Sequence, residues 1–235
     1  MRFHTQTAGV SLTAQQPLNN IVRTAIEALA GVLGGTQSLH TNSYDEALAL
    51  PTEDAVRIAL RTQQIIAHET GVASTIDPLG GAYFVEALTD ELERQAYRYF
   101  QTIDELGGMV AAVKQNYPQR EIADASFDLQ NEIDASRRIV VGVNAYRQDD
   151  EQPLDILRID ADLERKQIGR TQAVRARRES AAVDAALSAL KQTAACEDAN
   201  LMPGLIDAAR AHVTEGEIVE ALQEVFGSYT ETPVF

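Results

Sequence analysis

Two short polar segments near the start of the chain decide its fold. The chain reads RFHTQTAG at residues 2–9 and TQSLHTN at residues 36–42. Between them, apolar residues recur at helical spacing over about 17–33, and the pair Gly34-Gly35 provides a helix stop. Strand, helix, strand is the repeating unit of a parallel α/β fold, and the sequence predicts this unit here.

The composition of these two strands is unusual for a parallel sheet. Parallel strands that are buried on both faces are rich in Val, Ile and Leu, whereas these carry His, Gln, Ser, Thr and Asn. Buried polar side chains are costly unless hydrogen bonds satisfy them. We therefore expect the two strands to line a cavity that holds a polar ligand.

Alternation along the strands sorts the polar side chains into faces. His4 and Gln6 share one side of the first strand, and Ser38 and His40 share one side of the second, with Gln37 on the opposite side. The spacing alone leaves open which face meets the cavity. A histidine in a core strand is more often a structural residue than a ligand contact, but the density of polar groups here favours ligand binding.

The rest of the chain is predicted to be mostly helical. Thr52 is a good N-cap for a helix that ends at Gly71. Further helices are expected at about 84–100, 119–135, 161–193, 200–213 and 216–226. The β-branched run at 139–143 predicts a strand. Basic side chains between 165 and 178 indicate a solvated helix face, with a surface for an acidic partner or a phosphate as the alternative.

Composition excludes several classes of function. The net charge of −15 disfavours nucleic acid as a partner. No apolar run approaches the roughly 20 residues of a membrane span, and we expect no membrane association. The single cysteine, Cys196, excludes an internal disulfide and fits a reducing cytoplasm. No metal-ligand spacing, phosphate-binding glycine loop or nucleophile elbow is present, so we expect no metal site.

Longer motifs, taken in their order, resemble one family. They lie at residues 2–17, 34–43, 60–64, 77–81, 107–109, 117–120 and 141–144. These motifs together extend over essentially the whole chain. They are similar to the large subunit of the adenosylcobalamin-dependent acyl-CoA mutases, whose type member is methylmalonyl-CoA mutase.

The resemblance implies a fold and a division into domains. Residues 1–149 would be the C-terminal part of a (β/α)8 TIM barrel, which is incomplete here, and residues 150–235 a mostly helical extension next to a cobalamin-binding domain. In the family, the CoA chain threads along the barrel axis between small polar side chains. Cobalamin covers one end of the barrel, and its radical chemistry permits a carbon-skeleton rearrangement.

The resemblance also implies site residues, position by position. The expected substrate-binding residues are His4, Gln6 and Gln37. The expected cofactor-binding residues, in contact with the corrin, are Gly9, Glu46, Ala47 and Gln130. A glycine lets the backbone approach a flat macrocycle closely, and Glu46 and Gln130 would bond the amide arms of the corrin. Without the resemblance, Asp45-Glu46 is more simply a pair of acids that open a surface helix.

Several parts of the family are expected to lie outside this chain. A complete barrel needs about 250 residues or more, and the resemblance begins at what would be the sixth strand. The catalytic histidine, the groups that clamp the acyl chain and the CoA phosphates, and the histidine that ligates cobalt would then belong elsewhere. We therefore expect no catalytic residue here, and expect a complementary half-barrel, a cobalamin-binding subunit or domain, and an oligomeric assembly as partners.

The function expected from the resemblance is part of an acyl-CoA mutase, inactive alone and cytoplasmic, that converts methylmalonyl-CoA to succinyl-CoA with adenosylcobalamin. An isobutyryl-CoA or 2-hydroxyisobutyryl-CoA mutase subunit is the alternative within the same chemistry. A different class of function is a non-catalytic remnant or a binding module that docks on an intact mutase. The edge strand at residues 2–7 is also expected to promote self-association of the isolated chain.

Overall fold

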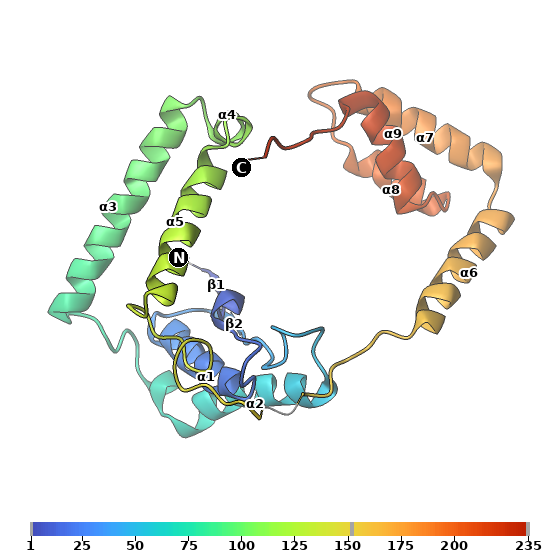
Figure 1. The fold of residues 1–235 in the computed structure, drawn as a ribbon. Coiled ribbons are helices and arrows are strands. Elements are labelled where there is room, and N and C mark those ends of the chain that lie inside the picture. Colours follow the sequence, from blue (N-terminus) through green and yellow to red (C-terminus); the bar gives the residue numbers. More distant parts are fainter. Residues whose placement is uncertain (1, 151–152, 234–235) are drawn as a thin grey trace. The chain divides into compact units, whose positions relative to one another are not determined.

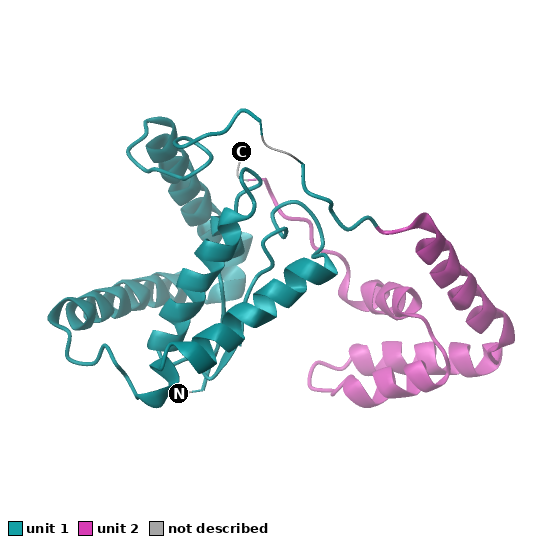
Figure 2. Ribbon diagram, turned by 90° about the horizontal axis from the view of Figure 1, so that it is seen from below, with its two compact units in different colours: residues 1–158, 234–235 teal, residues 159–233 magenta. Residues whose placement is uncertain are grey.

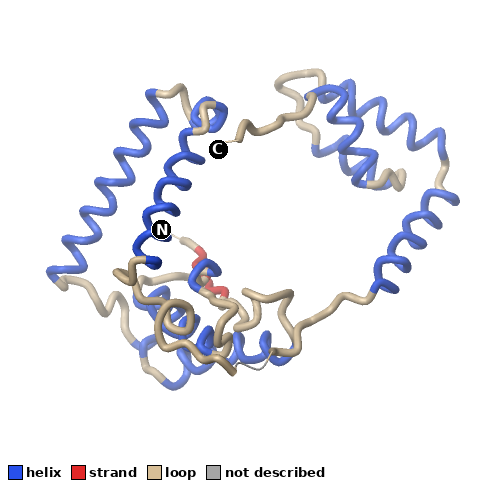
Figure 3. The backbone as a smooth tube through the Cα atoms, in the orientation of Figure 1, coloured by secondary structure: helices blue, strands red, loops and turns tan. Residues whose placement is uncertain are grey.

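The computed structural model describes residues 2–150 and 153–233 of the 235-residue chain. The chain forms two compact units, which divide between Arg158 and Ile159 (Figure 2). The first unit contains both strands, and the described part of the second is helical (Figure 3). Within the described residues, none of the helices is both long and apolar enough to cross a membrane.

The predicted order of strand, helix and strand is confirmed in the first unit, although both strands are shorter than expected. The regular elements of this unit are β1 (His4–Gln6), α1 (Asn19–Leu33), β2 (Ser38–His40), α2 (Glu53–Glu69), α3 (Tyr83–Glu105), α4 (Met109–Lys114) and α5 (Tyr117–Asp134), with single 3-10 turns at Gly9–Ser11 and Val72–Ser74 (Figure 1). The two strands pair in parallel, with His4 opposite Ser38 and Gln6 opposite His40.

Helix α1 covers one face of this small sheet. A Cβ added at Gly31 of α1 would lie 3.1 Å from Cγ2 of Thr5 and 3.7 Å from Cδ1 of Leu39. A side chain at residue 31 would therefore be crowded against the sheet. Because side chains alternate along a strand, His4, Gln6, Ser38 and His40 point to the other face.

Helix α2 is fixed to β2 by side-chain hydrogen bonds. The hydroxyl of Thr52 accepts from the backbone N–H of Ala55, which confirms the predicted N-cap. Nε2 of Gln63 donates to the carbonyl of Leu39 at 3.1 Å, and the hydroxyl of Thr41 donates to the carbonyl of Ala59 at 2.7 Å. These bonds hold α2 against the end of β2.

The prediction of a strand at 139–143 is wrong. Gly142 has a positive φ of 85°, and the segment folds around the side chain of Asn144. The Oδ1 of Asn144 accepts from the N–H of Val140 at 2.7 Å, and its Nδ2 donates to the carbonyl of Ile133 at 2.8 Å. The N–H of Val140 is therefore not available to a neighbouring strand. The segment is a loop, and Asn144 within it caps the end of α5 through the carbonyl of Ile133.

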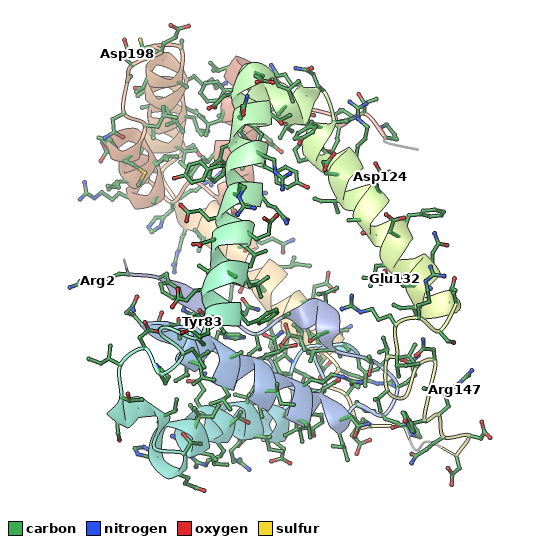
Figure 4. The ribbon with its side chains drawn as sticks, turned by 90° about the vertical axis from the view of Figure 1, so that its left-hand side faces the viewer. Arg2, Tyr83, Asp124, Glu132, Arg147 and Asp198 are labelled. Atoms are coloured by element: carbon green, nitrogen blue, oxygen red, sulfur yellow. The ribbon has the colours of Figure 1, made fainter. Side chains whose placement is uncertain are left out.

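The short helix α4 connects the two long helices α3 and α5. The hydroxyl of Tyr99 on α3 donates to Glu121 on α5 at 3.0 Å. Figure 4 shows the two helices separating from this end toward Tyr83 and Glu132. No residue of α3 is buried, although its sequence carries an apolar stripe. The helix therefore presents this stripe to solvent.

The second unit contains α6 (Ala161–Arg177), α7 (Ser180–Ala194), α8 (Met202–Arg210) and α9 (Glu215–Phe226). Its core is formed by Val183, Ala208 and Val213. The prediction of one helix over 161–193 is wrong, because Arg178 is extended and divides it into α6 and α7. The two shorter helices that follow are confirmed within a few residues.

The break between α6 and α7 is explained by a contact with α9. Nη1 and Nη2 of Arg178 donate to the two carboxylate oxygens of Glu217 at 2.6 and 2.5 Å. Glu217 also completes a capping box with Thr214 at the start of α9. The side chains of Arg178 and Glu217 are 12% and 18% exposed, so this pair joins the α6–α7 corner to the N-terminus of α9.

Candidate functional site

The open face of the two-stranded sheet brings together two of the three predicted substrate-side residues. His4 and Gln6 lie on this face with Ser38 and His40, and all four are exposed. The Nδ1 of His4 is 2.7 Å from the Oγ of Ser38. The face therefore offers imidazole, amide and hydroxyl groups side by side, which suits an uncharged ligand with hydrogen-bonding groups.

Gln37 is not on this face. Its Oε1 accepts from the N–H of Phe3 at 2.8 Å, and its Nε2 donates to the carbonyl of Gly35 at 2.6 Å. The side chain is exposed but is held at the N-terminal edge of the sheet by the backbone. The structure thus separates Gln37 from His4 and Gln6, with which it was expected to bind the substrate, and leaves it on the side opposite Ser38 and His40 that alternation along its own strand indicates.

The C-terminal edge of the sheet carries three of the four predicted cofactor-side residues. Because the strands are parallel, Gly9 after β1 and the segment 42–47 after β2 follow the same edge. The N–H of Thr7 donates to the carbonyl of His40 at 3.1 Å, and the N–H of Asn42 donates to the hydroxyl of Thr7 at 2.9 Å. These bonds continue the strand pairing beyond β1 and β2 and hold the two connections together.

Asn42 is a candidate that sequence reasoning missed. It is 2% exposed, its Oδ1 accepts from Nε2 of Gln6 at 3.2 Å, and a Cβ on Gly9 would lie 3.3 Å from its Nδ2. That Nδ2 has no hydrogen-bond partner within the described residues. A buried donor without a partner is rare and calls for an explanation. The signal in the sequence was an asparagine directly after a polar strand.

Glu27 of α1 supports the turn that carries Gly9. Its carboxylate accepts from the N–H of Ala8 at 2.8 Å and from the hydroxyl of Ser11. The carboxylate thus binds both ends of the turn from the helix side. Sequence reasoning missed this residue because it is an ordinary polar position on an amphipathic helix.

Glu46 and Ala47 are exposed in the turn after β2. Their neighbour Asp45 is buried and accepts from both the N–H and the hydroxyl of Thr52 at 2.9 Å. The two adjacent acids therefore differ, since Asp45 anchors the turn to the start of α2 whereas Glu46 faces solvent. Glu46 lines a hollow of about 560 Å³ between the end of β2 and α2, together with His40 and Gln63.

Gln130 on α5 is exposed, and its Nε2 donates to Asp134 of the same helix at 2.7 Å. Its neighbour Leu129 and the next-turn residue Ile133 line a largely apolar hollow of about 730 Å³ with Val10 and Ile26. Helix α5 and the segment that follows Gly9 therefore border the same hollow. The structure does not join the Gln130 side chain to Glu46.

Among residues 2–150 and 153–233, no three His, Cys, Asp or Glu side chains gather closely enough to hold a metal ion. Cys196 is exposed just after the end of α7.

Comparison with known proteins supports the resemblance that the motifs suggested. The family model described as methylmalonyl-CoA mutase matches residues 1–228. Methylmalonyl-CoA mutase of Rhizobium meliloti (strain 1021) is 50% identical over 234 residues, which is 99% of this chain and 33% of that protein. The 2-hydroxyisobutanoyl-CoA mutase large subunit of Aquincola tertiaricarbonis is 47% identical over 236 residues, 100% of this chain and 42% of that protein. The mitochondrial methylmalonyl-CoA mutase of Homo sapiens is 44% identical over 230 residues, 97% of this chain and 31% of that protein.

The chain thus spans between about a third and two fifths of the length of these curated relatives. The family match and the identities nevertheless extend along almost all of its own residues. On this evidence the chain belongs to the methylmalonyl-CoA mutase family.

Proposed function

We propose that this chain supplies part of the substrate barrel of an adenosylcobalamin-dependent acyl-CoA mutase, with methylmalonyl-CoA and succinyl-CoA as the interconverted pair. The observation that carries the proposal is the arrangement of side chains on the small sheet. Its open face is polar, and its C-terminal edge gathers Gly9, Asn42 and Glu46. In barrels of this type, chemistry occurs at the C-terminal edge of the strands.

The substrate side of the proposal rests on His4 and Gln6. The CoA chain carries amide groups and a thioester carbonyl, which need hydrogen-bond donors and acceptors in a narrow lumen. An imidazole and a side-chain amide two residues apart on one strand face supply both. Gln37 is bonded to the backbone of Phe3 and Gly35 and lies off this face, so we do not place it against the substrate.

The residues at the C-terminal edge of the sheet are chemically compatible with a corrin. Gly9 leaves the backbone open to a flat ring, Ala47 adds only a methyl group, and Glu46 offers an exposed carboxylate. The unpartnered Nδ2 of Asn42 offers a buried donor at the same edge. These groups suit a large neutral molecule with many amides, and Gln130 would bind it from α5.

Adenosylcobalamin, when bound, supplies a carbon-centred radical from its cobalt–carbon bond. This chain's own residues would hold the substrate along the polar face, position the cofactor at the C-terminal edge and keep water away from both. The ligand of cobalt and the catalytic histidine are proposed to belong to other parts of the assembly. The two described strands would then be neighbours in a (β/α)8 barrel that a complementary half-barrel completes, and the helical unit would lead to a cobalamin-binding domain.

A second substrate is favoured by one specific observation. A relative named 2-hydroxyisobutanoyl-CoA mutase large subunit is nearly as similar as the methylmalonyl-CoA mutases, at 47% against 50% identity. Discrimination between these acyl groups would come from side chains that surround the acyl end. The substrate 2-hydroxyisobutyryl-CoA, or isobutyryl-CoA, is therefore the alternative for the same fold and cofactor.

The test is reconstitution with the missing parts. The chain would be combined with the remaining two thirds of the Rhizobium meliloti relative and with adenosylcobalamin, and isomerisation of methylmalonyl-CoA and of 2-hydroxyisobutyryl-CoA would be measured. Turnover that requires this chain supports the proposal, and His4→Ala should abolish most of it. The matched control is His68→Ala, an exposed histidine on α2 away from the sheet. A correctly assembled complex without turnover of any acyl-CoA would refute the proposal.

A further inference from the structure

The side chain of Asn20, in the first turn of α1, is fully buried and makes four hydrogen bonds. Its Oδ1 accepts from the N–H of Thr13 at 3.1 Å and from Nη1 of Arg23 at 2.8 Å. Its Nδ2 donates to the carbonyls of Thr13 and Tyr44, both at 2.9 Å. A side-chain amide offers two donor hydrogens and two acceptor lone pairs. These four partners therefore use the whole hydrogen-bonding capacity of Asn20.

The chemistry of the partners fixes the orientation of this amide. A backbone N–H and a guanidinium can only donate, and a backbone carbonyl can only accept. The oxygen of Asn20 must therefore face Arg23 and the N–H of Thr13, and its nitrogen must face the two carbonyls. The opposite orientation would set donors against donors at a site with no access to water.

Arg23 lies one turn further along α1 and extends the set of bonds to another part of the chain. Its Nη1 also donates to the hydroxyl of Thr13 at 2.9 Å, and its Nη2 donates to the carbonyl of Val141 at 2.8 Å. Val141 belongs to the loop in which Asn144 caps the end of α5 at the carbonyl of Ile133. The guanidinium thus connects α1 to the loop that fixes the end of α5.

The segments bonded to Asn20 and Arg23 are the same three that carry the proposed cofactor contacts. Thr13 lies in the connection after β1, which also contains Gly9. Tyr44 lies in the segment 42–47 after β2, and Val141 follows α5. These segments are far apart in the sequence, and one pair of neighbouring side chains on α1 contacts all of them.

We propose that Asn20 and Arg23 are positioning residues that hold these three segments in one arrangement at the C-terminal edge of the sheet. The inference rests on the proposed function in one respect, the identity of the ligand at this edge as adenosylcobalamin. A large, rigid ring that contacts several segments binds more tightly when these are already in place, because no ordering cost is paid on binding. Asn20 is fully buried, so it acts through its partners.

The first experiment measures hydrogen exchange by mass spectrometry on the 235-residue chain without any ligand. Arg23→Met keeps the aliphatic stem and removes the guanidinium. Exchange should become about three- to tenfold faster in peptides that cover 136–146, as expected for loss of one hydrogen bond. The matched control is Arg57→Met on α2, whose guanidinium pairs with Glu53 and Asp54 of its own helix. This control should leave exchange in 136–146 unchanged.

Asn20→Asp tests the connections that follow β1 and β2. Ionised aspartate has nearly the same shape and keeps the acceptor, but it has no donor, so the carbonyls of Thr13 and Tyr44 lose their partner. Exchange should become faster in peptides that cover 8–16 and 42–47. If this variant does not fold, the measurement on the arginine variant decides alone.

A second readout uses the reconstituted mutase. Arg23→Met should weaken cobalamin affinity about three- to tenfold and leave CoA affinity unchanged. In a Gln130→Ala background the same substitution should weaken cobalamin affinity by a smaller factor, because the contact that Arg23 positions through α5 is already absent. A role in stability alone would give equal factors in both backgrounds, since independent sites are additive.

Three results would overturn the proposal. They are wild-type exchange at 136–146 in Arg23→Met, an equal acceleration there in Arg57→Met, and equal losses of cobalamin affinity with and without Gln130. Failure of the wild-type assembly to turn over acyl-CoA would instead refute the proposed function. The exchange measurements involve no ligand, so the two failures are distinguishable.

Discussion

Replacing Glu217 by Gln should destabilise the helical unit by about 1–2 kcal/mol at neutral pH. Glu217 accepts from both terminal nitrogens of Arg178, at 2.6 and 2.5 Å, and from the N–H of Thr214 at 2.9 Å. Glutamine has nearly the same shape but only one acceptor oxygen and no charge. The variant therefore removes the ion pair without opening a cavity.

The magnitude follows from the effect of Arg178 on the carboxylate. The hydrogen bond from Arg178 lowers the pKa of Glu217 from 4.5 to about 2, with a smaller contribution from Thr214 and against the opposing effect of partial burial. A lowering of this size corresponds to about 3 kcal/mol of favourable interaction in a fully shielded pair. Because the pair lies at the surface of a small unit, water screens it and about half or less remains.

The same pKa fixes the direction of the pH dependence. The folded state holds the carboxylate ionised down to about pH 2, whereas the unfolded chain protonates it near 4.5. The stabilisation is therefore fully present above pH 4.5 and is lost as the pH falls from 4.5 toward 2. Glu217→Gln should lack this part of the acid sensitivity.

Hydrogen exchange measured by mass spectrometry on peptides from residues 175–220 is the appropriate assay, because the two units need not unfold together. The matched control is Glu224→Gln on the same helix, whose carboxylate is 2.6 Å from Nζ of Lys191 but 64% exposed, and it should change stability by about 0.5 kcal/mol or less. Equal protection of Glu217→Gln and wild type at pH 7, or an equal acid response in both, would refute the reasoning.

Three further predictions concern the site and the sheet. Glu46→Ala and Gln130→Ala should each weaken cobalamin affinity in the reconstituted enzyme by a few-fold to about tenfold while CoA binding is retained. Titration with cobalamin and with CoA measures both affinities. A change in folding yield alone would contradict this prediction. Gly9→Ala places a methyl group 3.3 Å from Nδ2 of Asn42, so it should reduce cobalamin affinity without unfolding the chain, as measured by the same titration beside a thermal melt. The isolated chain should self-associate through the outer edge of β1; light scattering on a size-exclusion column that finds a monodisperse monomer would exclude this.

The sequence predicted those features that depend on local patterns. Alternation grouped His4 with Gln6 and Ser38 with His40 but left open which face of each strand meets the cavity, and the Thr52 cap was visible in the sequence. The break at Arg178 was not visible, because arginine and glutamate are good helix formers and the cause is a contact with Glu217, 39 residues away. The strand predicted from the β-branched run at 139–143 was wrong for a similar reason, because the side chain of Asn144 accepts from the N–H of Val140, which a strand would use for pairing.

The candidate site was predictable only to the same extent. Gly9 and Glu46 were expected from family motifs, but nothing local distinguished Glu46 from its buried neighbour Asp45. Asn42 and Glu27 gain their interest from burial and from long-range hydrogen bonds, which one sequence does not display. Gln130 was expected to contact the corrin from family motifs, and in the structure its side chain donates to Asp134 on its own helix.

The close approach of Gly31 to Thr5 has a consequence for the open face of the sheet. With 3.1 Å between an added Cβ and Cγ2 of Thr5, a larger residue at 31 requires the Thr5 side chain, α1 or the strands to shift by a few tenths of an ångström. Residues on the reverse of the sheet therefore set the spacing and tilt of the His4 and Ser38 side chains without ever meeting a ligand. The open face of the sheet could therefore be altered in two ways, by replacing its own residues or by changing the packing layer of α1 behind them.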